Sequence, residues 1–190
     1  MTDNTRFGLY DSSLDKNSCG VGFLTRKDGK QTHDLLVKGH EALCAVPHRG
    51  GMSAEGVGDG AGVSIDLSLE FFNQVTGHNL CMGGFGVGNF FMPSDVSQHE
   101  LAKQLIDDAL SAAGMKTLIT RDVPVNNDVL RPAALKYQLP IMQWVFLAPK
   151  GIEGDNFNLK IHQVLLAVES RAYTESELSG LYPLSLSAQT

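Results

Sequence analysis

The residue with the clearest chemical potential is Cys19, which begins the glycine-spaced run 19–23 (CGVGF). A thiol attacks a carbonyl carbon as its thiolate, and an ordinary cysteine pKa of about 8.5 leaves only a small fraction ionised at neutral pH. The small residues beside Cys19 leave its thiol open and allow a substrate to approach the backbone closely. The run therefore predicts a nucleophilic cysteine that needs a base.

Removal of the residues before Cys19 would supply that base. Residues 1–18 are polar and are predicted to form a leader or loop, with no apolar stretch of the kind found in secretory signals. If this leader is cleaved, the new α-amino group of Cys19, with a pKa of roughly 7.7–8.0, can accept the proton of the thiol. No histidine offers a clear alternative base from its position in the sequence.

Two further motifs follow Cys19 at short intervals. Residues 47–51 (PHRGG) place Arg49 and Gly50 just after a predicted helix, and residues 58–62 (GDGAG) contain Asp59 and Gly60. Residues 47–62, which contain both motifs, are rich in glycine and have almost no large side chains. Such a stretch is typical of a loop that comes very close to another group.

The elements that must position these motifs alternate irregularly between helix and strand. Apolar spacing predicts four helices, and short β-rich runs bounded by turn residues predict six strands. Ser97 with Glu100 predicts a capping box for the helix over 98–113, and Gly114 predicts its end. The absence of regular βαβ units favours an α+β layered domain. The expected helices cover 33–46, 69–75, 98–113 and 157–170, and the expected strands cover 20–25, 63–66, 84–91, 117–123, 141–147 and 181–186.

Composition narrows the function classes. The chain has 190 residues and a formal net charge of -6, without clustered Lys or Arg, which argues against nucleic-acid binding. Its apolar stretches are too short to span a bilayer. The three cysteines suggest neither a disulfide framework nor a metal site. We therefore expect a cytoplasmic protein. We expect Cys44 to lie in a helix and pack in the core, and Cys81 to lie in a loop without a chemical role.

The ordered motifs, together with residues 121–126 (RDVPVN), resemble the class II (N-terminal nucleophile) glutamine amidotransferases, and among them the glutaminase domain of glutamate synthase. The resemblance implies an αββα sandwich, with residues 19–190 as the N-terminal part of the domain. It implies that Cys19, Arg49 and Gly50 are catalytic and that Arg49, Gly50, Asp59 and Gly60 bind glutamine. It implies no metal or cofactor in this segment, but FMN and an iron–sulfur cluster in the full-length enzyme.

The same resemblance implies partners and leaves alternatives open. The implied partners are glutamine, the remaining domains of the large subunit, and a reductase small subunit or ferredoxin. The family's substrate-binding arginine and its Asn-Gly oxyanion pair are expected after Thr190, so this segment is expected to be incomplete, marginally stable and by itself inactive. One alternative is a structural or interaction module. Another is a different class II amidotransferase, against which the leader and residues 121–126 weigh.

Overall fold

The structure, a computed structural model, describes residues 6–7, 10–11, 20–45, 57–58 and 60–189. The chain divides into two compact units, residues 1–63 and 64–190. In the first unit, β1 (Arg6–Phe7) pairs antiparallel with β2 (Tyr10–Asp11), within the predicted leader. Helix α1 (His33–Ala45) confirms the helix that the apolar spacing predicts there.

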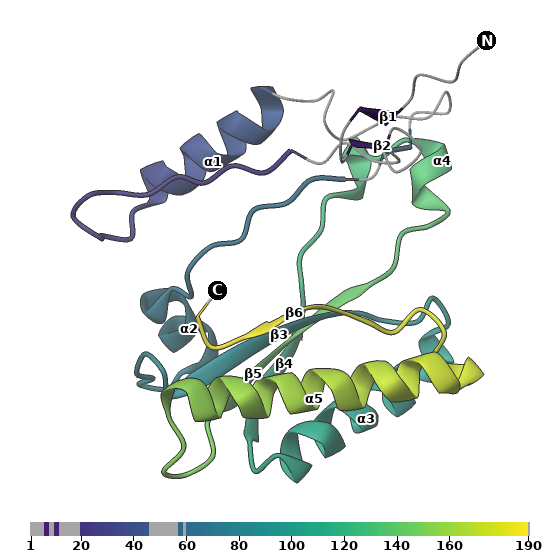
Figure 1. Ribbon diagram of the computed structural model, residues 1–190. Coiled ribbons are helices and arrows are strands. Elements are labelled where there is room, and N and C mark those ends of the chain that lie inside the picture. The colour runs from purple at the N-terminus through teal and green to yellow at the C-terminus, as the bar shows by residue number, and fades with distance from the viewer. Residues whose placement is uncertain (1–5, 8–9, 12–19, 46–56, 59, 190) are drawn as a thin grey trace. The chain divides into compact units, whose positions relative to one another are not determined.

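The second unit is built on one four-stranded antiparallel sheet (Figure 1). Its strand order is β4-β5-β3-β6, and every neighbouring pair is antiparallel. This arrangement confirms the mixed fold without βαβ units, and all four of its strands were expected within a few residues of their bounds. The αββα sandwich, which needs a second sheet, stays a prediction. The strands are β3 (Phe85–Phe91), β4 (Lys116–Asp122), β5 (Ile141–Leu147) and β6 (Tyr182–Ser187).

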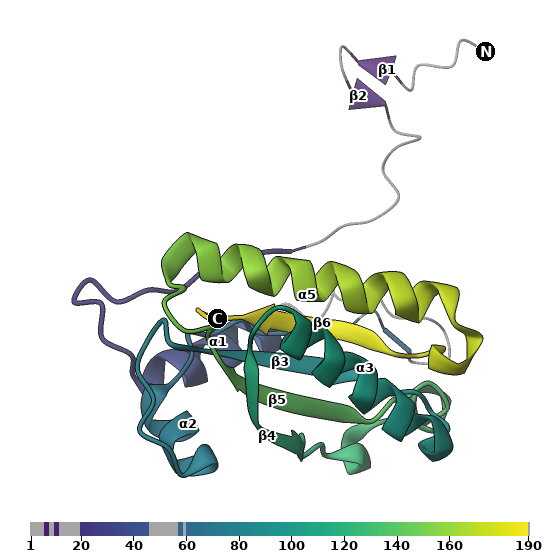
Figure 2. The ribbon, with the colours of Figure 1, turned by 90° about the horizontal axis from the view of Figure 1, so that it is seen from below.

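Helices α3 (His99–Ala112) and α5 (Gly154–Thr174) lie side by side on one face of this sheet (Figures 1 and 2). Alternate residues of the central strands point to that face, because successive side chains of a strand point to opposite sides. They meet the buried stripes of both helices in one apolar core. The largest fully buried members are Trp144, Phe90, Phe146, Phe157, Met92, Ile106 and Leu110.

A smaller apolar cluster occupies the opposite face. Helix α2 (Leu69–Thr76) packs Phe72 against Phe85, with their ring centroids 5.7 Å apart. Val145 of the central strand β5 also belongs to this cluster. Its buried members are Leu67, Phe72, Leu80, Phe85, Val87 and Val145.

The two ends of α3 show which capping predictions were correct. Gly114 follows α3 with a φ of 81°, in the left-handed region that glycine adopts without strain, as expected. The predicted capping box is wrong, because Ser97 donates both its N–H and its hydroxyl to Asp95 Oδ1, at 2.9 and 2.7 Å. Asp95 thereby caps the short 3-10 helix η3 (Val96–Gln98), and α3 begins only after it.

Several further elements depart from the expectations. The predicted strands over 20–25 and 63–66 form no regular strand. Three short helices were not predicted: η4 (Asn127–Val129) and α4 (Pro132–Leu135) between β4 and β5, and η5 (Ser176–Leu178) before β6. In α4, Pro132 stands in the first turn, where its missing N–H costs no hydrogen bond.

Candidate functional site

Of the residues predicted to carry the chemistry, Gly60 lies within the part of the chain that the structure describes. Cys19, Arg49, Gly50 and Asp59 lie outside the described residues. Their roles therefore stay predictions.

Gly60 has a φ of 81°, a conformation that strains any residue with a Cβ. Among the described residues, no atom lies within 4 Å of a Cβ built at Gly60 or at Gly62. The expected close approach is thus not seen at these two positions. At Gly60 the demand for glycine comes from the backbone conformation and not from crowding.

The segment that follows Cys19 is irregular and exposed, where a strand was expected. Val21 is 96% exposed and Phe23 is 90% exposed. A strand exists only through hydrogen bonds to a neighbouring strand, and none of the described strands pairs with this segment. Among the described residues, its apolar side chains Val21 and Phe23 therefore stay exposed.

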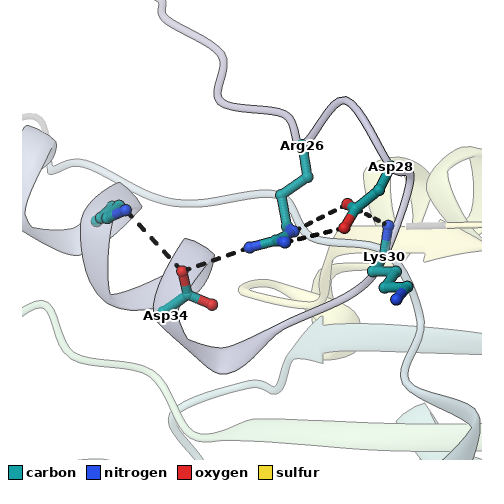
Figure 3. A network of polar contacts seen from close by, with 5 residues as sticks. Arg26, Asp28, Lys30 and Asp34 are labelled. Atoms are coloured by element: carbon teal, nitrogen blue, oxygen red, sulfur yellow. Dashed lines mark hydrogen bonds and ion pairs between the residues drawn. The ribbon is translucent and has the colours of Figure 1, made fainter.

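A charged turn connects this segment to α1 (Figure 3). Arg26 donates from Nε and Nη2 to the two carboxylate oxygens of Asp28, at 3.0 and 2.9 Å, and the N–H of Lys30 donates to Asp28 Oδ1 at 3.2 Å. Arg26 Nη1 also lies 3.8 Å from Asp34 Oδ2 in the first turn of the helix. The predicted turn over 27–30 is confirmed, with Gly29 at a φ of 64°.

The hydrogen bonds of the Arg26 guanidinium group shift the pKa values in this turn. Hydrogen bonds from Arg26, and then from the N–H of Lys30, hold the pKa of the Asp28 carboxyl below its ordinary value. The same pairing raises the pKa of Arg26. The turn therefore keeps its charges at neutral pH, and its contacts join residues 26–30 to the first turn of α1.

The two described cysteines are both free and exposed. The expectation that Cys44 packs in a core is wrong, because none of the residues of α1 is buried. Cys44 Sγ instead lies 3.6 Å from His40 Nε2, one helical turn earlier. Cys81 lies in a loop before β3, as expected.

A row of polar side chains crosses the sheet of the second unit and was not predicted from the sequence. Arg121, singled out within residues 121–126, donates from Nε to Gln143 Oε1 at 2.8 Å. Gln143 Nε2 donates to Asn89 Oδ1 at 2.9 Å, and Asn89 Nδ2 donates to Ser185 Oγ at 2.8 Å. A usable signal was present, because Gln143 and Asn89 each interrupt an otherwise apolar strand.

The comparisons with known proteins bear on the whole of this chain. Residues 19–190 match the family model described as glutamine amidotransferases class-II. The chain belongs to this family. The match covers residues 19–63 of the first unit and all of the second unit of the amidotransferase chain, and it begins at Cys19 itself.

Curated relatives of this amidotransferase segment are glutamate synthases. A glutamate synthase (NADPH) large chain of Azospirillum brasilense is 30% identical over 191 residues, covering 98% of this chain. A ferredoxin-dependent glutamate synthase of Synechocystis is 35% identical over 78% of the chain, and one of Arabidopsis thaliana is 32% identical over 96%. The chain spans only 12%, 10% and 12% of these relatives' own lengths.

The remaining features of the amidotransferase segment concern small ligands and membranes. An open hollow of about 360 Å³ lies where β4 ends and β5 begins, lined by Ser94, Asp122, Val123, Val125, Gln138, Pro140 and Ile141. Within the described ranges, no three His, Cys, Asp or Glu side chains gather as they would around a metal ion. No described helix is long and apolar enough to cross a bilayer.

Proposed function

We propose that this chain is the N-terminal part of the glutaminase domain of a glutamate synthase, with Cys19 as its nucleophile. The observation that carries the proposal is the family match that begins at Cys19. The names of the three curated relatives given above, each a glutamate synthase, support the choice among class II amidotransferases.

The proposed reaction begins when the leader is removed and Cys19 gains a free α-amino group. That amine accepts the thiol proton, and the thiolate attacks the γ-amide carbonyl of glutamine. The tetrahedral intermediate collapses, the C–N bond breaks, and the leaving nitrogen takes the proton and departs as ammonia. Water then cleaves the γ-glutamyl thioester, releasing glutamate and restoring the thiol.

The other site residues have positioning roles in this proposal. The backbone carbonyl of Arg49 orients the new α-amino group, and Gly50 leaves room beside the nucleophile. Asp59 and Gly60 shape the loop against the bound glutamine. The left-handed φ of Gly60, 81°, supports a loop whose backbone requires glycine at that position.

The proposed fold is the αββα sandwich. The sheet of the second unit, with α3 and α5 on one face, supplies one sheet and one helical layer. Its other face is only partly covered by α2 and is the surface on which a second sheet would pack.

In the complete enzyme, the ammonia is proposed to aminate 2-oxoglutarate in a domain that holds FMN and an iron–sulfur cluster. The described residues do not fit such a cluster, since Cys44 and Cys81 lie in different units and no ligand set gathers around either. We therefore assign the cluster to the other domains of the subunit, and we propose the same for FMN on the resemblance alone. The relatives' names leave NADPH, NADH or ferredoxin as the electron donor, and we place the enzyme in the cytoplasm.

The test is a comparison of thiols in the longest natural form of the protein. Mass spectrometry of its N-terminus is expected to show a chain that starts at Cys19. Glutamine-dependent ammonia release is expected to vanish in Cys19→Ala and to persist in Cys44→Ala and Cys81→Ala, which remove the other two thiols. Equal activity in Cys19→Ala and wild type would reject the nucleophile, and a processed but inactive protein would leave only a structural role.

A further inference from the structure

On the sheet face opposite α3 and α5, four polar side chains from four strands lie at one level. The strand register pairs Arg121 with Gln143, Gln143 with Asn89, and Asn89 with Ser185. Their side chains are joined by the three hydrogen bonds of 2.8, 2.9 and 2.8 Å given above. We call these four residues the polar row.

The polar row has a fixed direction, because a guanidinium group can only donate. Gln143 must therefore accept with Oε1 and donate with its amide nitrogen, and Asn89 must do the same toward Ser185. The Ser185 hydroxyl accepts from Asn89, so its own proton is free to donate elsewhere. The groups that the row still offers are mainly N–H and O–H donors, with one positive charge at the Arg121 end.

Arg121 has no counter-charge within the part of the chain that the structure describes. None of the salt bridges among the described residues joins Arg121 to an Asp or a Glu. Its one hydrogen-bond acceptor there is the neutral amide of Gln143. A cation that is half-buried without an anion has lost part of its hydration and gained no ionic partner in return.

The Arg121 guanidinium is also held in place. Its Cζ lies 5.5 Å from the centroid of the Phe71 ring of α2, and its Nε is bonded to Gln143. Two contacts thus restrict a side chain that otherwise loses rotamer entropy on binding. The terminal nitrogens Nη1 and Nη2 remain as a pair of parallel donors, which match a planar oxyanion in the bidentate geometry of an Arg–carboxylate pair.

We propose that the Arg121 end of the polar row is a receptor for a carboxylate. A carboxylate fits better than a phosphate, because the row supplies a single positive charge, which balances one carboxylate but not a phosphate dianion. The carboxylate can come from a free amino acid or from an acidic side chain of a polypeptide, and both present the same two oxygens. This inference does not depend on the chemistry of Cys19.

The experiment measures how fast each arginine of the 190-residue chain reacts with phenylglyoxal, a reagent for accessible guanidinium groups, by peptide mass spectrometry. Exposed Arg131 serves as the internal standard. Sodium acetate is compared with acetamide, its neutral isostere, and with sodium chloride at equal ionic strength. A receptor with a dissociation constant of about 0.1 M would slow Arg121 about threefold at roughly 0.2 M acetate.

The expected result is that acetate slows Arg121 but not Arg131, and that acetamide and chloride slow neither. In Gln143→Met, which keeps the arginine but releases Nε, the protection by acetate is expected to fall. Equal effects of acetate and acetamide, or no effect of acetate on Arg121, overturn the proposal.

Two additions identify the source of the carboxylate once acetate protects. L-glutamate or L-glutamine that protects at about a tenth of the acetate concentration indicates an amino-acid ligand. Protection of Arg121 in the longest natural form of the protein without any additive, which high sodium chloride relieves, indicates an acidic side chain of the polypeptide, because salt screens an ion pair but does not expose a guanidinium that is merely covered.

Discussion

The helices of the two units differ in how far their apolar side chains are buried from solvent. Helix α1 of the first unit has 13 residues, none of them buried, although it carries Leu35, Leu36 and Leu43. Helix α5 of the second unit buries Phe157, Ile161, Val164 and Val168 against the sheet. The apolar spacing predicted both helices, so spacing alone did not distinguish a helix that buries its apolar residues from one whose described residues stay unburied.

The difference shows what holds each unit together. The second unit gains stability by removing large apolar side chains from water, at roughly 25 cal/mol per Å² of apolar surface. The first unit has local contacts instead: a charged turn between Arg26 and Asp28 and an ion pair between Asp34 and Lys38 at 3.9 Å. Such exposed contacts are each weak, and an isolated helix of this length is marginal in water.

The largest expected contrast between the units comes from truncating a phenylalanine in each. Phe90→Ala removes a fully buried ring that meets Trp144 edge-on, at a centroid distance of 5.3 Å, and is expected to cost about 3–5 kcal/mol. Phe23→Ala, at a 90% exposed site, is expected to change the unfolding free energy by less than about 0.5 kcal/mol.

Urea unfolding followed by far-UV circular dichroism, which reports the helices of both units, measures both variants, and the fluorescence of Trp144, the single tryptophan, reports the second unit separately. Comparable losses in Phe90→Ala and Phe23→Ala would mean that the first unit also has a core, and the contrast would be wrong.

Adding a methyl group to a glycine sharpens the same contrast. A Cβ at Gly88 of β3 would lie 2.5 Å from Leu186 Cδ1 and 2.8 Å from Phe90 Cε2. Gly88→Ala is therefore expected to cost about 1–3 kcal/mol through overpacking. Gly62→Ala of the first unit, where nothing among the described residues lies within 4 Å, is the matched control and is expected to leave the urea midpoint nearly unchanged.

A polar contact at the edge of the core should give an effect of similar size. Asp107 Oδ1 of α3 accepts from Trp144 Nε1 at 3.1 Å and from Thr117 Oγ1 at 2.9 Å. Asp107→Ala leaves the buried indole N–H without an acceptor and is expected to cost about 1–3 kcal/mol, with partial rescue by Asp107→Asn. The neighbouring Asp108→Ala, on the exposed side of the helix, is expected to cost only a few tenths of a kcal/mol.

The contrast also shows how much of the fold the sequence could reveal. The strands Ile141–Leu147 and Phe85–Phe91 were predicted because a short apolar run bounded by turn residues is typical of a buried strand. The strand over 20–25 was predicted from similar residues and is not formed. The difference is the neighbour that accepts and donates the backbone hydrogen bonds, which local sequence does not specify.

The candidate site was predictable only where a motif carried it. Cys19, Arg49 and Gly60 stand in runs whose order resembles an enzyme family, and the family match confirms the resemblance. The polar row has no such run, because Asn89, Gln143 and Ser185 come from strands far apart in sequence and meet only through the register of the sheet. Likewise, the capping box failed because Asp95, two residues before Ser97, took both of its donors.

The smallest expected effect concerns acid and the turn before α1. The pKa of Asp28 is lowered in the folded chain, first by its hydrogen bonds from Arg26, so the turn favours the folded state above the ordinary aspartate pKa near about 3.9. That contribution is lost as the pH falls below this value and through the lowered pKa.

Carbon-13 NMR titration of the Asp28 carboxyl is expected to show the lowered midpoint, and Arg26→Ala is expected to return it toward the ordinary value. Because this carboxyl is exposed, the global unfolding midpoint should barely move, while the protection factors of the Gly29 and Lys30 amides against hydrogen exchange should fall in acid. A midpoint that is already ordinary in the wild type would mean that the Arg26–Asp28 contact does not order the turn in solution, and α1 would then lack even this local support.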